Sequence, residues 1–500
     1  MTEPASSAVP GRLREVFGLD PRSLALFRIG LGVLLLANLA GRAPYFRMLY
    51  GAGGVLPEEV VTRFAPGWTA PYFAYQIDGS GPTLLALALV SAAFALMLVL
   101  GWRTRLATVA SWFLLVSLNT RNYLATSYDD YVLTLLLFFA MFLPLGARFS
   151  LDSRARAGPA PQGSVLSGGS VALILQFACI YFFSALLKTG ETWHSEGSAV
   201  FYALSQNYVA RFGASAVLEQ RELLALLTRT TFAWELLVGP LLLLPFWNGP
   251  IRTLVVVSVW GFHAGLGLFM TLFLFPWVMA VGAVALLPAW AWERLPGGAR
   301  PRAAASQLQS EARAGRAAWL IAPLRWLTHA VPLLALAYVL AFNLVGLSPE
   351  GELPAWLRSV GSTLRLNQRW AMYAPDPTHW DYFHVIPGSL ADGRRVELLR
   401  DGRVLTPDPP DTLPWRGPSR AWALYLDHAR AHRHKGPGLG LASWYCRSWN
   451  QAHAGSERLV KVEWLLVRFD LRRERAREDL PLGAWSCPAG PGGLTRPVGG

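Results

Sequence analysis

The sequence is poor in charge and in lysine. Only 15% of its 500 residues are charged, whereas 53% are hydrophobic. Of the 45 basic residues, three are lysine, and these are Lys188, Lys435 and Lys461. So little charge excludes an ordinary soluble globular protein and indicates an integral membrane protein. Because arginine is used almost everywhere else, each lysine raises the question of a chemical role.

The sequence also lacks the short motifs of soluble enzymes. It contains no GxSxG, no HExxH and no phosphate-binding loop. His428 and His432 are four residues apart and could share one helix face, but Arg430, Arg433 and Lys435 are interleaved with them. This pattern favours a solvated basic surface over a metal site, so we predict no metal.

Nine apolar segments approach the roughly 20 residues that a helix needs to cross a bilayer. We therefore predict an all-α polytopic membrane bundle. The nine expected spans cover residues 23–41, 82–101, 105–120, 129–146, 171–188, 230–247, 253–270, 272–291 and 327–346. Residues 1–22 have no apolar core or cleavage site of a signal peptide, so we expect the first span to be retained.

The distribution of arginine and lysine predicts the orientation. With the N-terminus inside, the inner segments hold fifteen basic residues and the outer loops hold eight. We therefore expect residues 1–22 to be cytoplasmic, 23–347 to form the bundle in a bacterial inner membrane, and 348–500 to lie outside. The net charge of +13 then reflects topology. It points to membrane lipid as a partner and not to nucleic acid.

The C-terminal region has the pattern of a small extracytoplasmic α+β domain. Short alternating runs such as DYFHVIPG and RRVELL, joined by ADGR, predict strands and a hairpin. RLVKVEWLLVRFDL predicts another strand, and AWALYLDHARAHRHK a helix. Cys446 and Cys487 are both expected outside, where a disulfide is permitted, but the sequence leaves their pairing open. Residues 292–320 have the composition of a cytoplasmic linker.

Ionisable residues inside the predicted spans are the candidates for chemistry. Lys188 ends the fifth span on its outer side, either as an interfacial anchor or as a general base. A lysine shielded from water gives up its proton more readily, whereas an arginine stays charged. Glu235 is either a structural partner for a buried cation or an active-site residue. His263 is either a buried neutral histidine or part of the site, and we treat Arg28 as structural.

Several motifs occur in an order that is typical of one family. They are FRIGLGVLLLANL, GGVLP, FLPLGARFSLD, IYFFSALLKTGETWHSEGSAVFYAL and FHAGLGLFMTLFLFPWVM, followed in the C-terminal region by RWAMYAPDP. In this respect the sequence resembles the HTTM family, the bacterial relatives of vitamin K-dependent gamma-carboxylase. The resemblance is clearest over residues 18–290.

The resemblance implies a function for Lys188, which lies five residues before Trp193 as the proposed catalytic lysine does in the family's carboxylases. In those enzymes that lysine is proposed to deprotonate reduced vitamin K. Oxygenation of the vitamin then creates a stronger base, which removes a γ-proton from a peptide glutamate. The resulting carbanion takes up carbon dioxide. The resemblance thus implies a reduced quinone as cofactor and a secreted peptide as substrate. Glu235 and His263 are its supporting catalytic residues.

We also expect Trp193, His194 and Tyr128 to contact the quinone. Tyr128 belongs to SYDDY, where the carboxylases have a catalytic histidine, and the region from residue 348 is too small for their propeptide-binding surface. A second hypothesis is therefore a non-catalytic module that binds a lipid or quinone and assists the folding or export of a partner.

Overall fold

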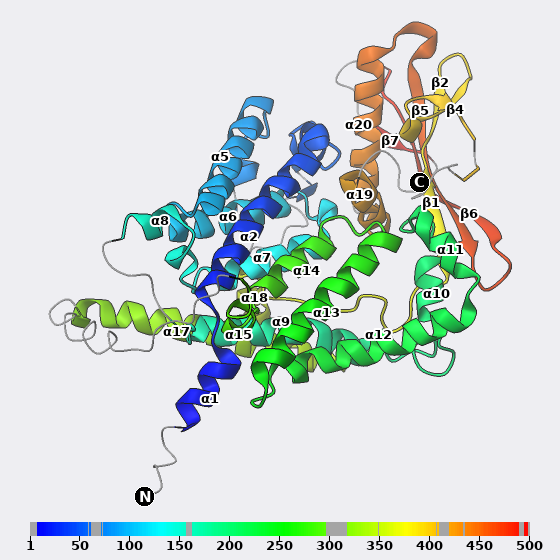
Figure 1. Cartoon of the computed structure of the whole chain (residues 1–500). Helices are drawn as coiled ribbons and strands as arrows, with labels where there is room; N and C mark the ends of the chain where they lie inside the picture. The colour runs from blue at the N-terminus through cyan, green and yellow to red at the C-terminus, as the bar shows by residue number, and fades with distance from the viewer. Residues whose placement is uncertain are drawn as a thin grey trace, which may run out of the picture.

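The computed structural model gives the fold of most of the chain. The residues it describes are all those outside 1–7, 59, 62–71, 73, 157–162, 297–317, 349, 407, 410–419, 434–435, 490–494 and 499–500. Residues 297–317 of the expected linker at 292–320 therefore lie outside the described residues. A helical bundle occupies one part of the molecule, and a sheet flanked by two helices the other (Figure 1).

Each of the nine expected segments contains a helix. These helices are α2 (Pro21–Arg42), α5 (Gly81–Leu100), α6 (Thr104–Arg121), α7 (Tyr128–Ala140), α9 (Gly168–Leu187), α12 (Arg221–Leu242), α13 (Asn248–Phe269), α14 (Phe275–Val284) and α17 (Ala318–Val345). A short helix, α1 (Ala8–Phe17), precedes them. The prediction of a predominantly helical membrane region is confirmed.

The count of nine spans is not confirmed. Within the described residues, five helices are long and apolar enough to cross a membrane, namely Pro21–Tyr50, Gly81–Leu100, Gly168–Leu187, Asn248–Phe269 and Thr328–Val345. Helices α7 and α14 have only 13 and 10 residues, which is too short for a hydrocarbon core of about 30 Å. Helix α12 carries Arg229 and Glu235 within its length.

Helix α9 lies at the centre of the bundle, and α5 at its edge. In α9, 72% of the apolar window is buried, against 17% in α5. Helix α9 packs against α7, α12 and α17, while α2 packs against α5 and α14. The side chains of α5 are therefore available to lipid, whereas polar groups on α9 must find partners inside the protein.

Short helices fill the connections between the long ones. They are η1 (Ala43–Tyr45), α3 (Phe46–Tyr50), η3 (Ala74–Gln76), η4 (Tyr123–Ala125), η5 (Leu145–Ala147), α8 (Leu151–Arg154), α10 (Ala199–Leu204), η6 (Phe212–Ala214), α11 (Ser215–Leu218) and α15 (Ala289–Trp292). Several lie where the bundle meets the C-terminal region.

The C-terminal region is an antiparallel sheet with helices, so the α+β prediction is confirmed. Its strands are β1 (Trp380–Val385), β2 (Pro387–Leu390), β3 (Arg395–Glu397), β4 (Arg403–Val404), β5 (Leu459–Asp470), β6 (Ala476–Ser486) and β7 (Arg496–Pro497). Their order is β4-β3-β2-β5-β6-β7, with β1 also paired to β5. The helices are α18 (Ala355–Thr363), α19 (Arg420–Ala431) and α20 (Pro437–Ala452).

Two local predictions in this region are confirmed. Strands β2 and β3 form the expected hairpin, and Gly393 in its turn has a φ of 88°. This left-handed conformation is one that glycine adopts without strain. The disulfide that the sequence left open joins Cys446 on α20 to Cys487.

The C-terminal region shares an apolar core with the bundle. One cluster of buried residues contains Leu118 of α6 and Tyr50 of α3 together with Tyr425 and Trp464 of the C-terminal region. The Tyr425 hydroxyl donates to the carbonyl of Val55 at 2.8 Å. These contacts fix the C-terminal region against one end of the bundle, and that end also holds Lys188.

Candidate functional site

Lys188 lies directly after the last turn of the central helix. Ser167 caps the N-terminus of α9 in a capping box with Ser170, and an apolar run then carries the helix to Leu187. The helix ends at Lys188, whose backbone N–H still donates to Ala185. The lysine side chain is 2% exposed. The end of α9 therefore delivers an amine into the protein interior instead of into water.

Lys188 forms a buried ion pair with Glu235. Its Nζ lies 2.6 Å from Oε2 of Glu235, whose side chain is 9% exposed. Nζ also donates to Ser184 one helical turn earlier, at 2.7 Å to Oγ and 3.3 Å to the carbonyl. Helix α9 thus supplies Ser184 and Lys188, and α12 supplies the carboxylate. A buried charge is tolerated when it is paired and hydrogen-bonded, as it is here.

Trp193 covers the ammonium group and His194 contacts the backbone of Lys188, both from the loop that follows α9, residues 189–198, which we call the Lys188 loop. The Trp193 ring centroid is 5.0 Å from Nζ, within the range of a cation–π contact. His194 donates from Nε2 to the carbonyl of Lys188 at 2.7 Å, and its ring lies 4.9 Å from Phe232. The structure therefore brings two of the three expected quinone-contacting residues to Lys188.

A second polar pair lies further along α9, where it faces α13. His263 of α13 and the Tyr181 hydroxyl of α9 are 2.9 Å apart, and the Tyr181 ring packs on Trp234 at 5.0 Å. His263 is buried, and its Nδ1 has no hydrogen-bond partner in the described part of the chain. Tyr181 precedes Lys188 by seven residues, so both lie on one face of α9. His263 thus belongs to the same helix junction without touching Lys188.

Sequence reasoning missed Tyr181 and Ser184. Both lie in the apolar run of α9 at helical spacing from Lys188, and that spacing was the available signal. A serine in a span often bonds a carbonyl of its own helix, and a tyrosine ring is ordinary in an apolar core, so the pattern alone did not distinguish them.

Tyr128 is placed elsewhere. It begins α7 and is 42% exposed. Among the described residues it has no hydrogen bond or ring contact with Lys188, Glu235 or His263. Its neighbour Asp130 is buried and pairs with Arg42 at 2.6 Å. The SYDDY stretch therefore builds a separate buried ion pair.

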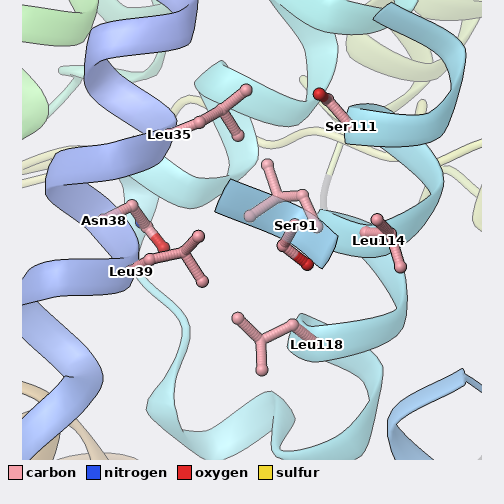
Figure 2. Close-up of a pocket in the computed structure, with 8 residues that line it drawn as sticks. Leu35, Asn38, Leu39, Ser91, Ser111, Leu114 and Leu118 are labelled. Atoms are coloured by element: carbon pink, nitrogen blue, oxygen red, sulfur yellow. The ribbon is translucent and has the colours of Figure 1, made fainter. Parts of the chain in front are cut away.

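A small cavity lies between α2, α5 and α6 (Figure 2). Leucine side chains line most of it, and Asn38, Ser91 and Ser111 add polar groups. Its volume is about 20 Å³, which is room for a water-sized group. The helices that form it are not those that hold Lys188 and Glu235, so it does not belong to the Lys188 site.

Together, an apolar helical bundle and a lysine–carboxylate pair sealed at one end of its central helix define a polytopic membrane protein with a polar site inside the bundle. The family model of the HTTM domain matches residues 18–292, which is more than half of the chain. The chain belongs to the HTTM family and is thus a membrane protein related to the gamma-carboxylases. No curated protein and no solved structure matches it.

Proposed function

We propose that this protein is a quinol-dependent membrane enzyme that modifies glutamate side chains of an exported peptide, with Lys188 as its base. The observation that carries the proposal is the burial of the Lys188–Glu235 pair at the end of α9. Burying an ionisable side chain costs folding free energy, and the Lys188 side chain is only 2% exposed. Ionisable residues within membrane bundles are typically functional.

Lys188, Glu235 and Ser184 have different roles in the proposed proton transfer. As a free amine, Lys188 accepts a proton from an acidic hydroxyl group. The pair then holds this proton between Nζ and the Glu235 carboxylate, 2.6 Å apart, either as an ion pair or as two neutral groups, and it must release the proton before Lys188 is a free amine again. Ser184 fixes the position of Nζ through its hydroxyl and carbonyl. The pair can thus act as one proton-accepting unit.

The side chains around the pair are of the kinds that contact an aromatic cofactor with polar oxygens. Trp193, Tyr181 and Trp234 provide aromatic rings, and Nδ1 of His263 is a buried polar atom without a described partner. When bound, a reduced quinone would be oxygenated by dioxygen, and this oxidation would supply the strong base that takes the γ-proton of glutamate. The balance is an oxygenated quinone, one water and a glutamate whose γ-carbon has gained carbon dioxide.

We further propose that the Lys188 end of the bundle faces the outside of the bacterial inner membrane. The excess of basic residues in the opposite connections supports this orientation. The disulfide between Cys446 and Cys487 supports it too, because disulfides persist in oxidising compartments. An exported peptide would then reach the site without entering the cytoplasm.

The test is incorporation of labelled carbon dioxide into a glutamate-rich peptide by the purified protein, supplied with a reduced naphthoquinone and dioxygen. Wild type should incorporate label and Lys188→Ala should not, while both remain folded. Lys188→Arg should also be inactive, because a guanidinium does not act as a base. Unchanged incorporation by Lys188→Ala would remove Lys188 from the mechanism.

One observation favours the second hypothesis, a non-catalytic module that binds a lipid or quinone. The ammonium group of Lys188 already has three acceptors, two on Ser184 and one on Glu235, as a purely structural ion pair would. In that case quinone or lipid should copurify with the wild-type protein while no labelled carbon dioxide is incorporated. This result would contradict the enzymatic proposal.

A further inference from the structure

The segment between α18 and β1 runs through the core of the bundle before it reaches the sheet. Leu366 and Trp370 are each 1% exposed within the main apolar cluster. Gln176 in the middle of α9 donates from Nε2 to Oε1 of Gln368 at 3.2 Å. Backbone without regular structure is tolerated at this depth because protein surrounds it. The segment follows α9 and ends against the Lys188 loop.

Residues 373–376, which we call the clamp segment, hold the Lys188 loop through its backbone. The N–H of Gly190 donates to the carbonyl of Pro375 at 3.1 Å. Oδ1 of Asp376 accepts from the N–H of Thr192 at 3.0 Å and also from the Thr192 hydroxyl. A carboxylate that accepts two hydrogen bonds makes charge-assisted contacts, which are stronger than neutral ones.

The same segment sets the position of the ring above Lys188. The indole N–H of Trp193 donates to the carbonyl of Tyr373 at 2.8 Å. The Trp193 ring is 5% exposed and lies 5.0 Å from Nζ of Lys188. The loop has only turns of its own here, among them the bond from the Trp193 N–H to the Gly190 carbonyl, and the contacts with the clamp segment add to these in positioning the ring.

Gly190 leaves no room for movement at this contact. A Cβ at that position would lie 1.9 Å from Oδ2 of Asp376. The carboxylate cannot turn away without giving up its two bonds to Thr192. The Asp376 carboxylate can therefore pack against position 190 only because Gly190 has no side chain.

We propose that Asp376 is a positioning residue for Lys188. By fixing the Lys188 loop it keeps Trp193 over the amine and keeps water away from it, so the C-terminal region completes the Lys188 site. A role of this positioning in catalysis rests on the proposed function. The positioning itself does not, because it is read from contacts that exist without substrate.

The scarcity of lysine gives a direct test in the full-length protein. Labelling by a water-soluble amine reagent, followed by mass spectrometry of the peptides, reports on Lys188 with Lys461 as an internal reference. Lys188 should react slowly in wild type and about tenfold faster in Asp376→Ala, since the loop loses a charge-assisted contact. Asp376→Asn keeps an acceptor oxygen and should restore much of the protection.

A double-mutant comparison separates this contact from general destabilisation. Gly190→Ala should raise Lys188 labelling as Asp376→Ala does, because the new methyl group displaces the carboxylate. When both changes are combined, Gly190→Ala should add almost nothing, since the atom it strikes is gone. Asp392→Ala, which removes an exposed carboxylate of the same region, is the matched control and should leave Lys188 unchanged.

Two results would overturn the proposal. One is equal labelling of Lys188 in wild type and Asp376→Ala, and the other is full additivity of the two changes. If Asp376→Ala does not fold, Thr192→Val removes one of the two bonds and should raise labelling by about two- to fivefold. The assay needs no quinone and no turnover, so a failure of the carboxylation test leaves its outcome unaffected.

Discussion

At the scale of single residues, the rarity of lysine and its place at the end of a span singled out Lys188. The sequence left two roles open for Glu235, and the structure places its carboxylate against the amine. For Ser184 and Tyr181 the helical spacing from Lys188 was the only signal, and the contribution of Asp376 could not be predicted. These contributions depend on which helix face meets which, and on a segment almost 190 residues further along the chain that returns to the site.

The buried pair predicts an asymmetric response to mutation. Lys188→Met leaves the Glu235 carboxylate buried without a partner and should cost about 3–5 kcal/mol of unfolding free energy. Combining it with Glu235→Leu removes both charges and should recover most of that loss. Thermal unfolding in detergent measures the difference.

A control for the pair is available on the surface. Glu352 pairs with Arg358, and these side chains are 70% and 43% exposed. Glu352→Ala should therefore change stability by less than about 1 kcal/mol. If Lys188→Met were equally mild, the Lys188–Glu235 pair would not be buried in the folded protein.

At the scale of elements, local patterns predicted the β2–β3 hairpin, α19 and β5 well, because turn residues and alternation act over a few positions. They failed where an apolar run is longer than the helix that it contains. The apolar run 129–146 was predicted as one span, but α7 ends at Ala140 and a turn before Pro144 continues it. Hydropathy registers burial and cannot tell a buried turn from a buried helix.

Strand β1 contributes a prediction about pH. Asp381 is fully buried, and burial raises its pKa to about 6, against the opposing effect of Arg475 and the backbone N–H groups of Asn207 and Tyr208. The folded protein thus keeps this proton up to about pH 6, whereas the unfolded chain releases it near 3.8. The stabilisation is complete below pH 3.8 and is lost as the pH rises through about 6.

Comparison of wild type with Asp381→Asn isolates the effect of the Asp381 carboxyl group on stability. From pH 4 to pH 7.5, wild type should lose about 2–3 kcal/mol of stability relative to the variant, which does not titrate at this position. Denaturant unfolding at the two pH values measures the change. A difference between the two proteins that is independent of pH, or a wild type that gains stability relative to the variant as the pH rises, would contradict the assignment.

At the scale of the whole molecule, composition predicted a helical membrane region and an α+β region. It did not predict that the two share a core, in which Tyr425 contacts the loop at Val55, or that residues 364–372 lie inside the bundle. Contacts between distant parts of a chain leave no local pattern. For the same reason the number of helices that cross the bilayer did not follow from counting apolar runs.

The proposed orientation can be tested with one introduced cysteine. Val404 on β4 is 81% exposed, while the native cysteines are buried or joined in a disulfide. Val404→Cys should react with a membrane-impermeant maleimide in intact spheroplasts. Leu151→Cys, at the opposite end of the bundle, should react only after permeabilisation. The reverse pattern would place the C-terminal region in the cytoplasm.

Binding of a quinol beside Lys188 can be tested by photo-crosslinking. A naphthoquinol carrying a photoreactive group would be irradiated with the purified wild-type protein, and the labelled peptides identified by mass spectrometry. We expect crosslinks to the end of α9, the Lys188 loop and the facing part of α12. These crosslinks should disappear when excess unmodified quinol competes for the site. Crosslinks confined to the cavity between α2, α5 and α6, or no competed crosslink at all, would contradict quinol binding beside Lys188.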